Sequence, residues 1–203
     1  MKIRTAVVAG LLAGIPLFAF AEAQGSASKS DADVELAVLI ENVARRTGVR
    51  AIIDPRVRAQ VPLANLDANK LSYEDLLAIL NVYQFVAVKR GDLLIVVPDA
   101  NSRQLPTPVY TDRNFKALPD EVVTLVLKVK NGCSMQMVPV LRPLMPQAAH
   151  MASYPDMGTL ILTDHAVNVH RIVDVIEAIE RNNPEGHGCP EFTMDKSDKP
   201  EKK

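Results

Sequence analysis

Residues 122–181 read VVTLVLKVKNGCSMQMVPVLRPLMPQAAHMASYPDMGTLILTDHAVNVHRIVDVIEAIER. The β-branched run at 122–129 predicts a strand, and the stretches 150–153 and 159–163 predict a hairpin. Two helices are predicted by apolar residues three and four positions apart: Met137, Val138, Leu141, Leu144 and Met145, then Val169, Ile172, Val173, Ile176 and Ile179. Pro143 should kink or shorten the first of these helices, because it lacks a backbone N–H. The order strand, helix, hairpin, helix predicts a βαββα module over 122–183.

A second pattern of helices and strands precedes this one, at residues 34–97. Helical spacing relates Leu36, Leu39, Ile40 and Val43, and the helix should end at Gly48. A short strand is predicted at 51–53, and Ser72 with Asp75 has the spacing of a capping box before a second helix. The runs 85–88 and 93–97 predict a hairpin. The fold class is therefore α+β, with two small modules, each of helices packed on a short mixed or antiparallel sheet.

The remaining segments are predicted to lie outside the two modules. Residues 98–121 contain four prolines without sustained periodicity, which predicts a Pro-containing linker between the modules. Lys2 and Arg4 precede an apolar run, which predicts a secretory signal peptide over 1–23, cleaved after Ala21 or after Ala23. Residues 24–33 then read as a flexible leader and 184–203 as a polar tail.

The composition argues against several classes of function. The 23 Lys and Arg against 24 Asp and Glu give a formal charge of -1, and aromatic residues make up 4%, which disfavours nucleic-acid binding. The chain has no glycine-rich phosphate loop, C-x-x-C or H-E-x-x-H motif. Five methionines between 135 and 157 leave copper binding as an alternative, but two of them belong to a helical apolar stripe, which favours packing. We therefore expect no enzyme activity, no cofactor and no metal.

Short motifs at defined places in residues 122–181 carry a family resemblance. The strand contains Val123-Thr124, the first helix contains L-R-P-L at 141–144, and the hairpin contains Tyr154-Pro155. T-L-I-x-x-D follows at 159–164, and N-V-x-R-I opens the last helix at 168–172. Together these motifs resemble the ring-building, KH-like periplasmic domain of type II secretion secretins. Residues 34–97 resemble, more loosely, the first secretin domain, which is also similar to the short signalling domain of TonB-dependent transducers.

The resemblance implies a periplasmic protein–protein interaction component of a type II secretion system or a related cell-envelope machine, similar to a detached amino-terminal secretin region. Its partners would be proteins of a secretion or pilus machine, such as a full-length secretin or an inner-membrane component, through which it would associate with the outer membrane. A homo-oligomer is left open. No secretin barrel follows residue 181, so we expect neither a pore from this chain alone nor a transmembrane segment after signal removal. The alternative is a periplasmic signalling module related to TonB-dependent transducers, which only residues 34–97 support.

Two cysteines are predicted to form a disulfide bond. Cys133 and Cys189 are an even pair in a chain expected to enter an oxidising compartment. In the βαββα order the two helices are antiparallel, so Cys133 at the start of one lies near the end of the other. Cys189 follows that end by a few residues, which makes a bond reachable. Two free thiols are the alternative.

A partner-binding strand is predicted at Leu93, Leu94, Ile95, Val96 and Val97. Relatives place a hydrophobic strand before the first helix, where this chain has only the polar leader. Loss of that strand would leave a sheet edge open to strand addition from another chain. The alternative is that Leu93–Val97 is a central strand or is covered by the linker.

Overall fold

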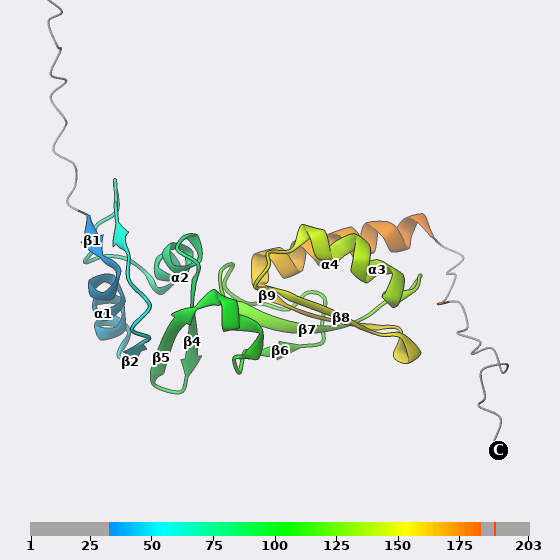
Figure 1. Ribbon diagram of the computed structural model, residues 1–203, viewed down its shortest axis with the longest axis horizontal. Coiled ribbons are helices and arrows are strands. Elements are labelled where there is room, and N and C mark those ends of the chain that lie inside the picture. Colours follow the sequence, from blue (N-terminus) through cyan, green and yellow to red (C-terminus); the bar gives the residue numbers. More distant parts are fainter. Residues whose placement is uncertain (1–32, 184–188, 190–203) are drawn as a thin grey trace, which may run out of the picture. The chain divides into compact units, whose positions relative to one another are not determined.

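A computed structural model of the chain describes residues 33–183 and residue 189 (Figure 1). The described part is α+β, which confirms the predicted fold class. We call residues 34–98 the first module and residues 109–182 the second module; each contains its own cluster of buried apolar side chains. The predicted signal peptide and polar tail lie outside the described residues, except for Cys189, and so does the leader, except for Asp33.

The first module packs two helices on short strands. Its elements are β1 (Val34–Glu35), α1 (Leu36–Thr47), β2 (Arg50–Ile53), β3 (Gln60–Val61), α2 (Tyr73–Val82), β4 (Phe85–Arg90) and β5 (Leu93–Pro98). Gly48 ends α1 with a φ of 70°, a conformation that glycine adopts without strain. The predicted capping box begins α2: Ser72 Oγ accepts a hydrogen bond from the Asp75 N–H at 3.0 Å, and the Asp75 carboxylate accepts one from the Ser72 N–H at 2.7 Å.

The prediction that Leu93–Val97 forms an open sheet edge is wrong. The main sheet has the order β2-β5-β4, so β5 pairs with a parallel strand on one side and an antiparallel strand on the other. Leu94 and Val96 are fully buried in the core of the first module. The parallel β2–β5 pairing joins segments far apart in sequence, which places the most apolar strand at the sheet centre. The strand expected to be missing is present as the two-residue β1, paired with β3.

The second module is a four-stranded sheet with the order β6-β7-β9-β8. Its elements are β6 (Val109–Tyr110), β7 (Val122–Lys128), α3 (Ser134–Leu141), η2 (Arg142–Leu144), β8 (His150–Tyr154), η3 (Pro155–Met157), β9 (Thr159–His165) and α4 (Ala166–Asn182). Figure 1 shows α3 and α4 side by side over one face of this sheet. The α-helix ends at Leu141 and Pro143 lies in the 3₁₀ turn η2, as expected from its missing N–H.

Part of the predicted linker is built into the second module. After the 3₁₀ helix η1 (Asp99–Gln104), β6 pairs in parallel with β7. Phe115 is buried in the core, where its ring stacks on Tyr110 and His170 with centroid distances of 4.7 and 4.1 Å. The segment was predicted to be irregular because a two-residue strand is too short to produce a periodic pattern.

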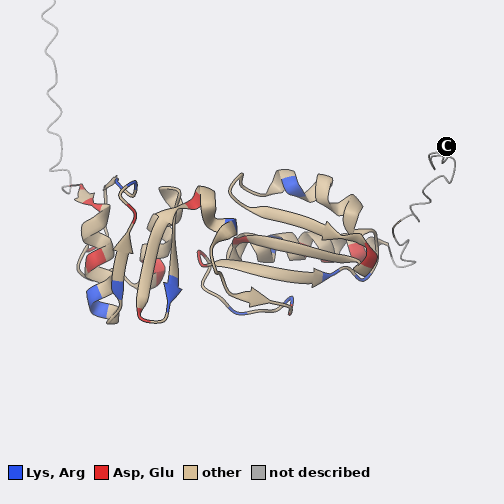
Figure 2. Cartoon of the chain, turned by 60° about the horizontal axis from the view of Figure 1, so that its bottom comes forward, with Lys and Arg blue, Asp and Glu red and all other residues tan. Residues whose placement is uncertain are grey.

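Basic residues gather at one end of the first module, where α1 ends and the β4–β5 hairpin turns (Figure 2). They come from the last turn of α1, the start of β2 and the end of β4: Arg45, Arg46, Arg50, Lys89 and Arg90. All five are exposed. Asp92 in the hairpin turn lies 2.8 Å from Arg50, so this end also holds one exposed ion pair.

Candidate interaction surface

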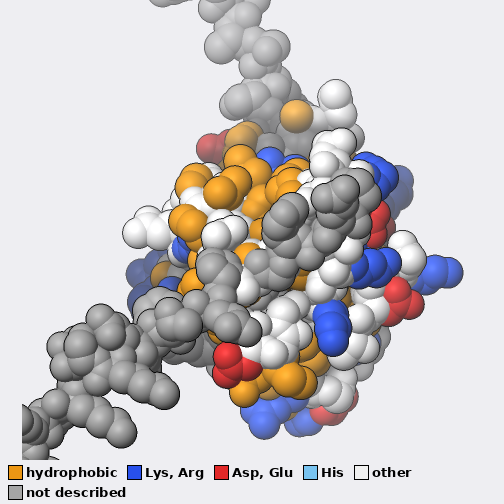
Figure 3. All heavy atoms as spheres, turned by 90° about the vertical axis from the view of Figure 1, so that its right-hand side faces the viewer, with side chains coloured by type: hydrophobic (Ala, Val, Ile, Leu, Met, Phe, Trp, Pro, Cys, Tyr) orange, Lys and Arg blue, Asp and Glu red, His pale blue; other side chains and the backbone are white. Residues whose placement is uncertain are grey.

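An exposed, uncharged apolar surface lies on α3 and η2. The exposed fractions of Met135, Val140 and Leu144 are 41%, 64% and 43%. Pro139 and Pro143 are exposed beside them. We call these five residues the α3 surface. On the face of the molecule in Figure 3, hydrophobic side chains gather in the upper left, on the side where α3 lies in Figure 1. Contiguous exposed apolar residues on a small domain mark a contact site for another molecule.

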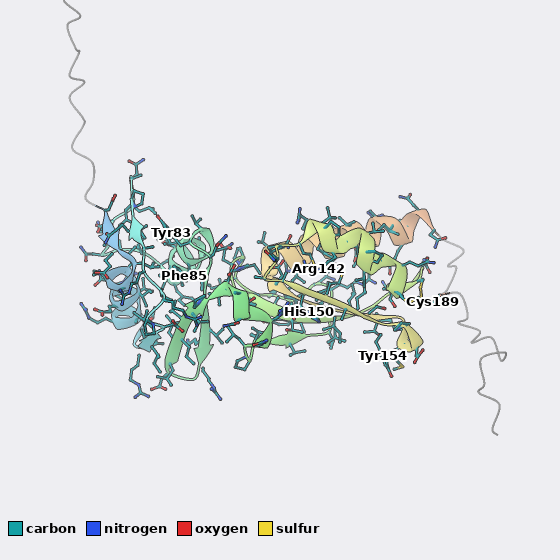
Figure 4. The ribbon with its side chains drawn as sticks, in the orientation of Figure 1. Tyr83, Phe85, Arg142, His150, Tyr154 and Cys189 are labelled. Carbon is teal, nitrogen blue, oxygen red and sulfur yellow. A yellow bond between two sulfur atoms is a disulfide. The ribbon has the colours of Figure 1, made fainter. Side chains whose placement is uncertain are left out.

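The single charged residue between 133 and 149, Arg142, does not interrupt this surface with a free charge. Its guanidinium donates hydrogen bonds to the backbone carbonyls of Pro146 at 2.9 Å and of Gln147 and Ala149 at 3.1 Å. Figure 4 shows Arg142 and His150 at the two ends of this connection between η2 and β8. Because the planar guanidinium has five donors in fixed directions, it holds several carbonyls of one loop at the same time. The arginine of the L-R-P-L motif thus holds the loop at 146–149, which connects η2 to β8.

A second network ties η2 to the start of α4. The buried Asp164 carboxylate accepts hydrogen bonds from the His165 N–H at 2.8 Å and from the Asn168 side-chain amide. Asn168 Oδ1 accepts a hydrogen bond from Arg171 Nε at 2.9 Å, and the Arg171 guanidinium donates to the Leu144 carbonyl. Burial raises the pKa of Asp164, although the hydrogen bonds from Asn168 and His165 act in the opposite direction. The T-L-I-x-x-D and N-V-x-R-I motifs therefore meet in one network beneath Leu144.

The start of α3 is held by two side-chain contacts. Cys133 is joined to Cys189 by a disulfide bond, with a distance of 4.3 Å between the Cα atoms. The yellow bond and the label of Cys189 lie at the end of the second module where α3 begins (Figure 4). The Ser134 hydroxyl, which is fully buried, lies 2.8 Å from the Ser153 hydroxyl of β8. Both ends of the α3 surface are thus fixed to neighbouring elements, so a partner would meet a preformed surface.

The predicted partner-binding strand does not contribute to this surface. Leu94 and Val96 point into the core of the first module, and Leu93, Ile95 and Val97 are partly buried on the other face of β5. Among the described residues, the outer strands of the two larger sheets are β2 and β4 in the first module and β6 and β8 in the second. The sequence does contain a signal for the α3 surface. The run 133–149 has more apolar residues than the buried stripe of one helix can use, and it has only one charged residue.

The described residues hold no cluster typical of a metal centre. No group of three or more His, Cys, Asp or Glu side chains within 33–183 and 189 is placed to bind a metal ion. His165 Nδ1 lies 3.0 Å from the Asp120 carbonyl, and His170 stacks on Phe115. Met137, Met145 and Met151 are buried in the core. Within the described helices, none is both long enough and apolar enough to cross a bilayer.

Comparison with known sequences relates the chain to one part of much longer proteins. Residues 31–96 match the family described as "GspD-like, N0 domain". Secretin XcpQ of Pseudomonas aeruginosa is 30% identical over 162 residues, which are 79% of this chain and 23% of XcpQ. Secretin ExeD of Aeromonas hydrophila is 29% identical over 161 residues, 77% of this chain and 23% of ExeD. The chain thus spans about a quarter of the length of these relatives.

A solved structure has a similar fold over most of this chain. It is the Klebsiella pneumoniae type II secretion system outer membrane complex of PulD, PulS and the PulC HR domain. The match covers 75% of this chain and 26% of the other, with 25% sequence identity and a TM-score of 0.64. The fold described above is therefore similar to the fold of a chain that is part of a secretion assembly.

Proposed function

Since this chain is a relative of the amino-terminal region of type II secretion secretins, we propose that it is a periplasmic protein–protein interaction component of a type II secretion or related envelope machine. The observation that carries this proposal is the α3 surface, in which Val140 is 64% exposed and the one charged side chain between 133 and 149, Arg142, is bonded to carbonyls of the loop that follows it. Such a surface is costly to expose to water unless a partner covers it. The function proposed for this surface is therefore binding to another protein.

The partner class follows from the relatives. The Klebsiella complex contains PulD together with PulS and the PulC HR domain. For this chain we propose partners from a secretion machine: a full-length secretin or an inner-membrane component. Periplasmic location agrees with the predicted signal peptide and with the Cys133–Cys189 bond, which an oxidising compartment maintains.

The test compares two charge substitutions at exposed valines. Val140→Asp places a carboxylate on the α3 surface, whereas Val82→Asp places one on α2, where Val82 is 78% exposed. Each full-length variant is tagged, purified from periplasm together with bound envelope proteins, and compared with wild type by quantitative mass spectrometry. Because burying an unpaired carboxylate in an apolar contact is costly, Val140→Asp should lower recovery of secretion components about tenfold or more. Val82→Asp should leave recovery unchanged. Equal recovery by all three proteins, or recovery without any secretion component, contradicts the proposal.

A further inference from the structure

A small apolar pocket opens at the basic end of the first module. Its volume is about 210 Å³, and it is lined by Thr47, Val49, Tyr73, Lys89 and Leu94. The pocket lies between the end of α1, the start of α2 and the sheet. Lys89 pairs with Leu94 across β4 and β5, so both side chains are on the face of the sheet that the helices cover. The helices leave this corner of the sheet uncovered.

The size of the pocket limits what it can hold. Sites for small organic ligands usually have volumes of about 300–1,000 Å³, whereas a cavity of about 150 Å³ accommodates benzene. A volume of about 210 Å³ therefore suits one large aliphatic or aromatic side chain. It is too small for the acyl chains of a lipid.

The charges around the pocket favour an acidic ligand. Lys89 is part of its lining, and Arg45, Arg46, Arg50 and Arg90 are exposed at the same end of the module (Figure 2). Arg50 is paired with Asp92, but Arg45, Lys89 and Arg90 form no ion pair with the residues that the structure describes. Burial, with a smaller contribution from the Glu121 carboxylate, raises the pKa of Tyr73, so this lining residue adds no negative charge to the pocket.

We propose that this corner of the first module is a second binding site, which takes an acidic peptide segment of a partner protein through one large apolar side chain. The apolar side chain fills the pocket, and carboxylates on neighbouring residues of the peptide lie against Lys89 and the exposed arginines. The site is in a different module from the α3 surface, so it can be present or absent independently of the function proposed above.

The test uses three synthetic peptides and the full chain labelled with ¹⁵N. The peptides are acetyl-DELDE-amide, the same peptide with alanine in place of leucine, and acetyl-KKLKK-amide. Amide chemical shifts are followed during titration at low and at physiological salt. We expect saturable shifts at Thr47, Val49 and Leu94 with the acidic leucine peptide, weakened by salt because exposed charges are screened. The alanine peptide and the basic peptide should bind at least about tenfold more weakly.

Two variants and one further ligand complete the test. Lys89→Glu should weaken binding of the acidic leucine peptide about tenfold, while Lys128→Glu, an equal charge change in the second module, should leave it unchanged. Equal binding of all three peptides, or shifts confined to other residues, overturns the proposal. Binding to phosphatidylglycerol vesicles without binding to the acidic peptide would assign the basic end to a lipid surface and would also overturn it.

Discussion

Replacing Glu180 by leucine removes one side of a nearly buried ion pair in the second module. Arg113 donates from both terminal nitrogens to the two carboxylate oxygens of Glu180, at 2.8 and 3.0 Å. The exposed fractions of the two side chains are 11% and 7%. Glu180 Oε1 also accepts a hydrogen bond from the Lys130 N–H at 2.6 Å. The pair therefore joins the segment before β7 to the end of α4. Its loss leaves the Lys130 N–H without this acceptor and the Arg113 charge without its nearest carboxylate, although the guanidinium keeps a hydrogen bond to the Lys128 carbonyl at 2.8 Å.

The magnitude follows from these contacts. Breaking a buried pair by removing one partner costs about 3–5 kcal/mol, because the other charge stays buried. Glu177, 3.4 Å from Arg113 and 39% exposed, remains as a weak partner, so we expect Glu180→Leu to lower the free energy of unfolding by about 2–3 kcal/mol. Glu177→Gln is the matched control and should cost less than about 1 kcal/mol. The double variant Arg113→Met/Glu180→Leu should recover more than half of the loss, because no charge is left unpaired.

The same pair predicts a pH dependence. Burial alone would raise the pKa of Glu180, but the hydrogen bonds from Arg113 and the Lys130 N–H, together with the Arg113 charge, hold that pKa below its ordinary value. A carboxyl whose pKa is lowered by folding stabilises the protein above its unfolded pKa, and this contribution is lost as the pH falls through the folded value. The difference between wild type and Glu180→Leu should therefore shrink on acidification below about pH 4.

Urea unfolding followed by far-UV circular dichroism measures these differences, since the chain has no tryptophan to report by fluorescence. A loss of less than about 0.5 kcal/mol for Glu180→Leu at pH 7 would refute the reasoning, because it would mean that the Arg113 charge is solvated in the folded protein. A double variant as unstable as the sum of Glu180→Leu and Arg113→Met, each measured alone, would refute it as well.

The remaining predictions concern the contacts that fix α3. The two cysteines should resist alkylation in unreduced, denatured protein, and modification of both thiols would contradict the bond. Cys189→Ser should lower the free energy of unfolding by up to about 4 kcal/mol, since the bond closes a loop with a sequence separation of 56. Asp164→Asn should lower the free energy of unfolding less at pH 7 than at pH 3, as measured by urea unfolding. The reason is that folding raises the pKa of Asp164, so the wild type loses stability when this group ionises as the pH rises, whereas asparagine does not ionise; the opposite order would contradict this. Arg142→Lys should lower the free energy of unfolding by about 1–2 kcal/mol and speed amide hydrogen exchange at Ala149 and His150, since an ammonium lacks the planar fork that bonds three carbonyls at once. Unchanged exchange would show that the guanidinium does not order this loop.

Local sequence patterns predicted the helices well because the interactions that form them are local. The Ser72–Asp75 capping box, the end of α1 at Gly48 and the break at Pro143 each depend on residues within one helical turn. The apolar stripe of α4 also matches its buried face, with Val169, Ile172, Val173 and Ile176 buried.

Pairings between distant segments were not predictable in this way. The position of β5 depends on its parallel contact with β2. The continuous apolar run LLIVV agrees with a central strand, but it does not show which strand pairs with it. The segment 109–115 is held by Arg113 on Glu180 and by Phe115 on His170, residues far apart in sequence. The α3 surface was missed because helical spacing says nothing of the face opposite the buried stripe. Leu144 was assigned to that stripe, but α3 ends at Leu141 and Leu144 is exposed in η2.

Site-specific photo-crosslinking from Val140 tests the interaction function most directly. A benzoylphenylalanine at position 140 of the full chain lies in the centre of the α3 surface, and the same residue at position 82 is the control on α2. After irradiation of intact cells of the native host, adducts are isolated and the joined protein is identified by mass spectrometry. We predict an adduct from position 140 with a secretin or an inner-membrane component of the secretion machine, and none from position 82. No such adduct from position 140, in cells that produce the machine, would contradict the proposed function.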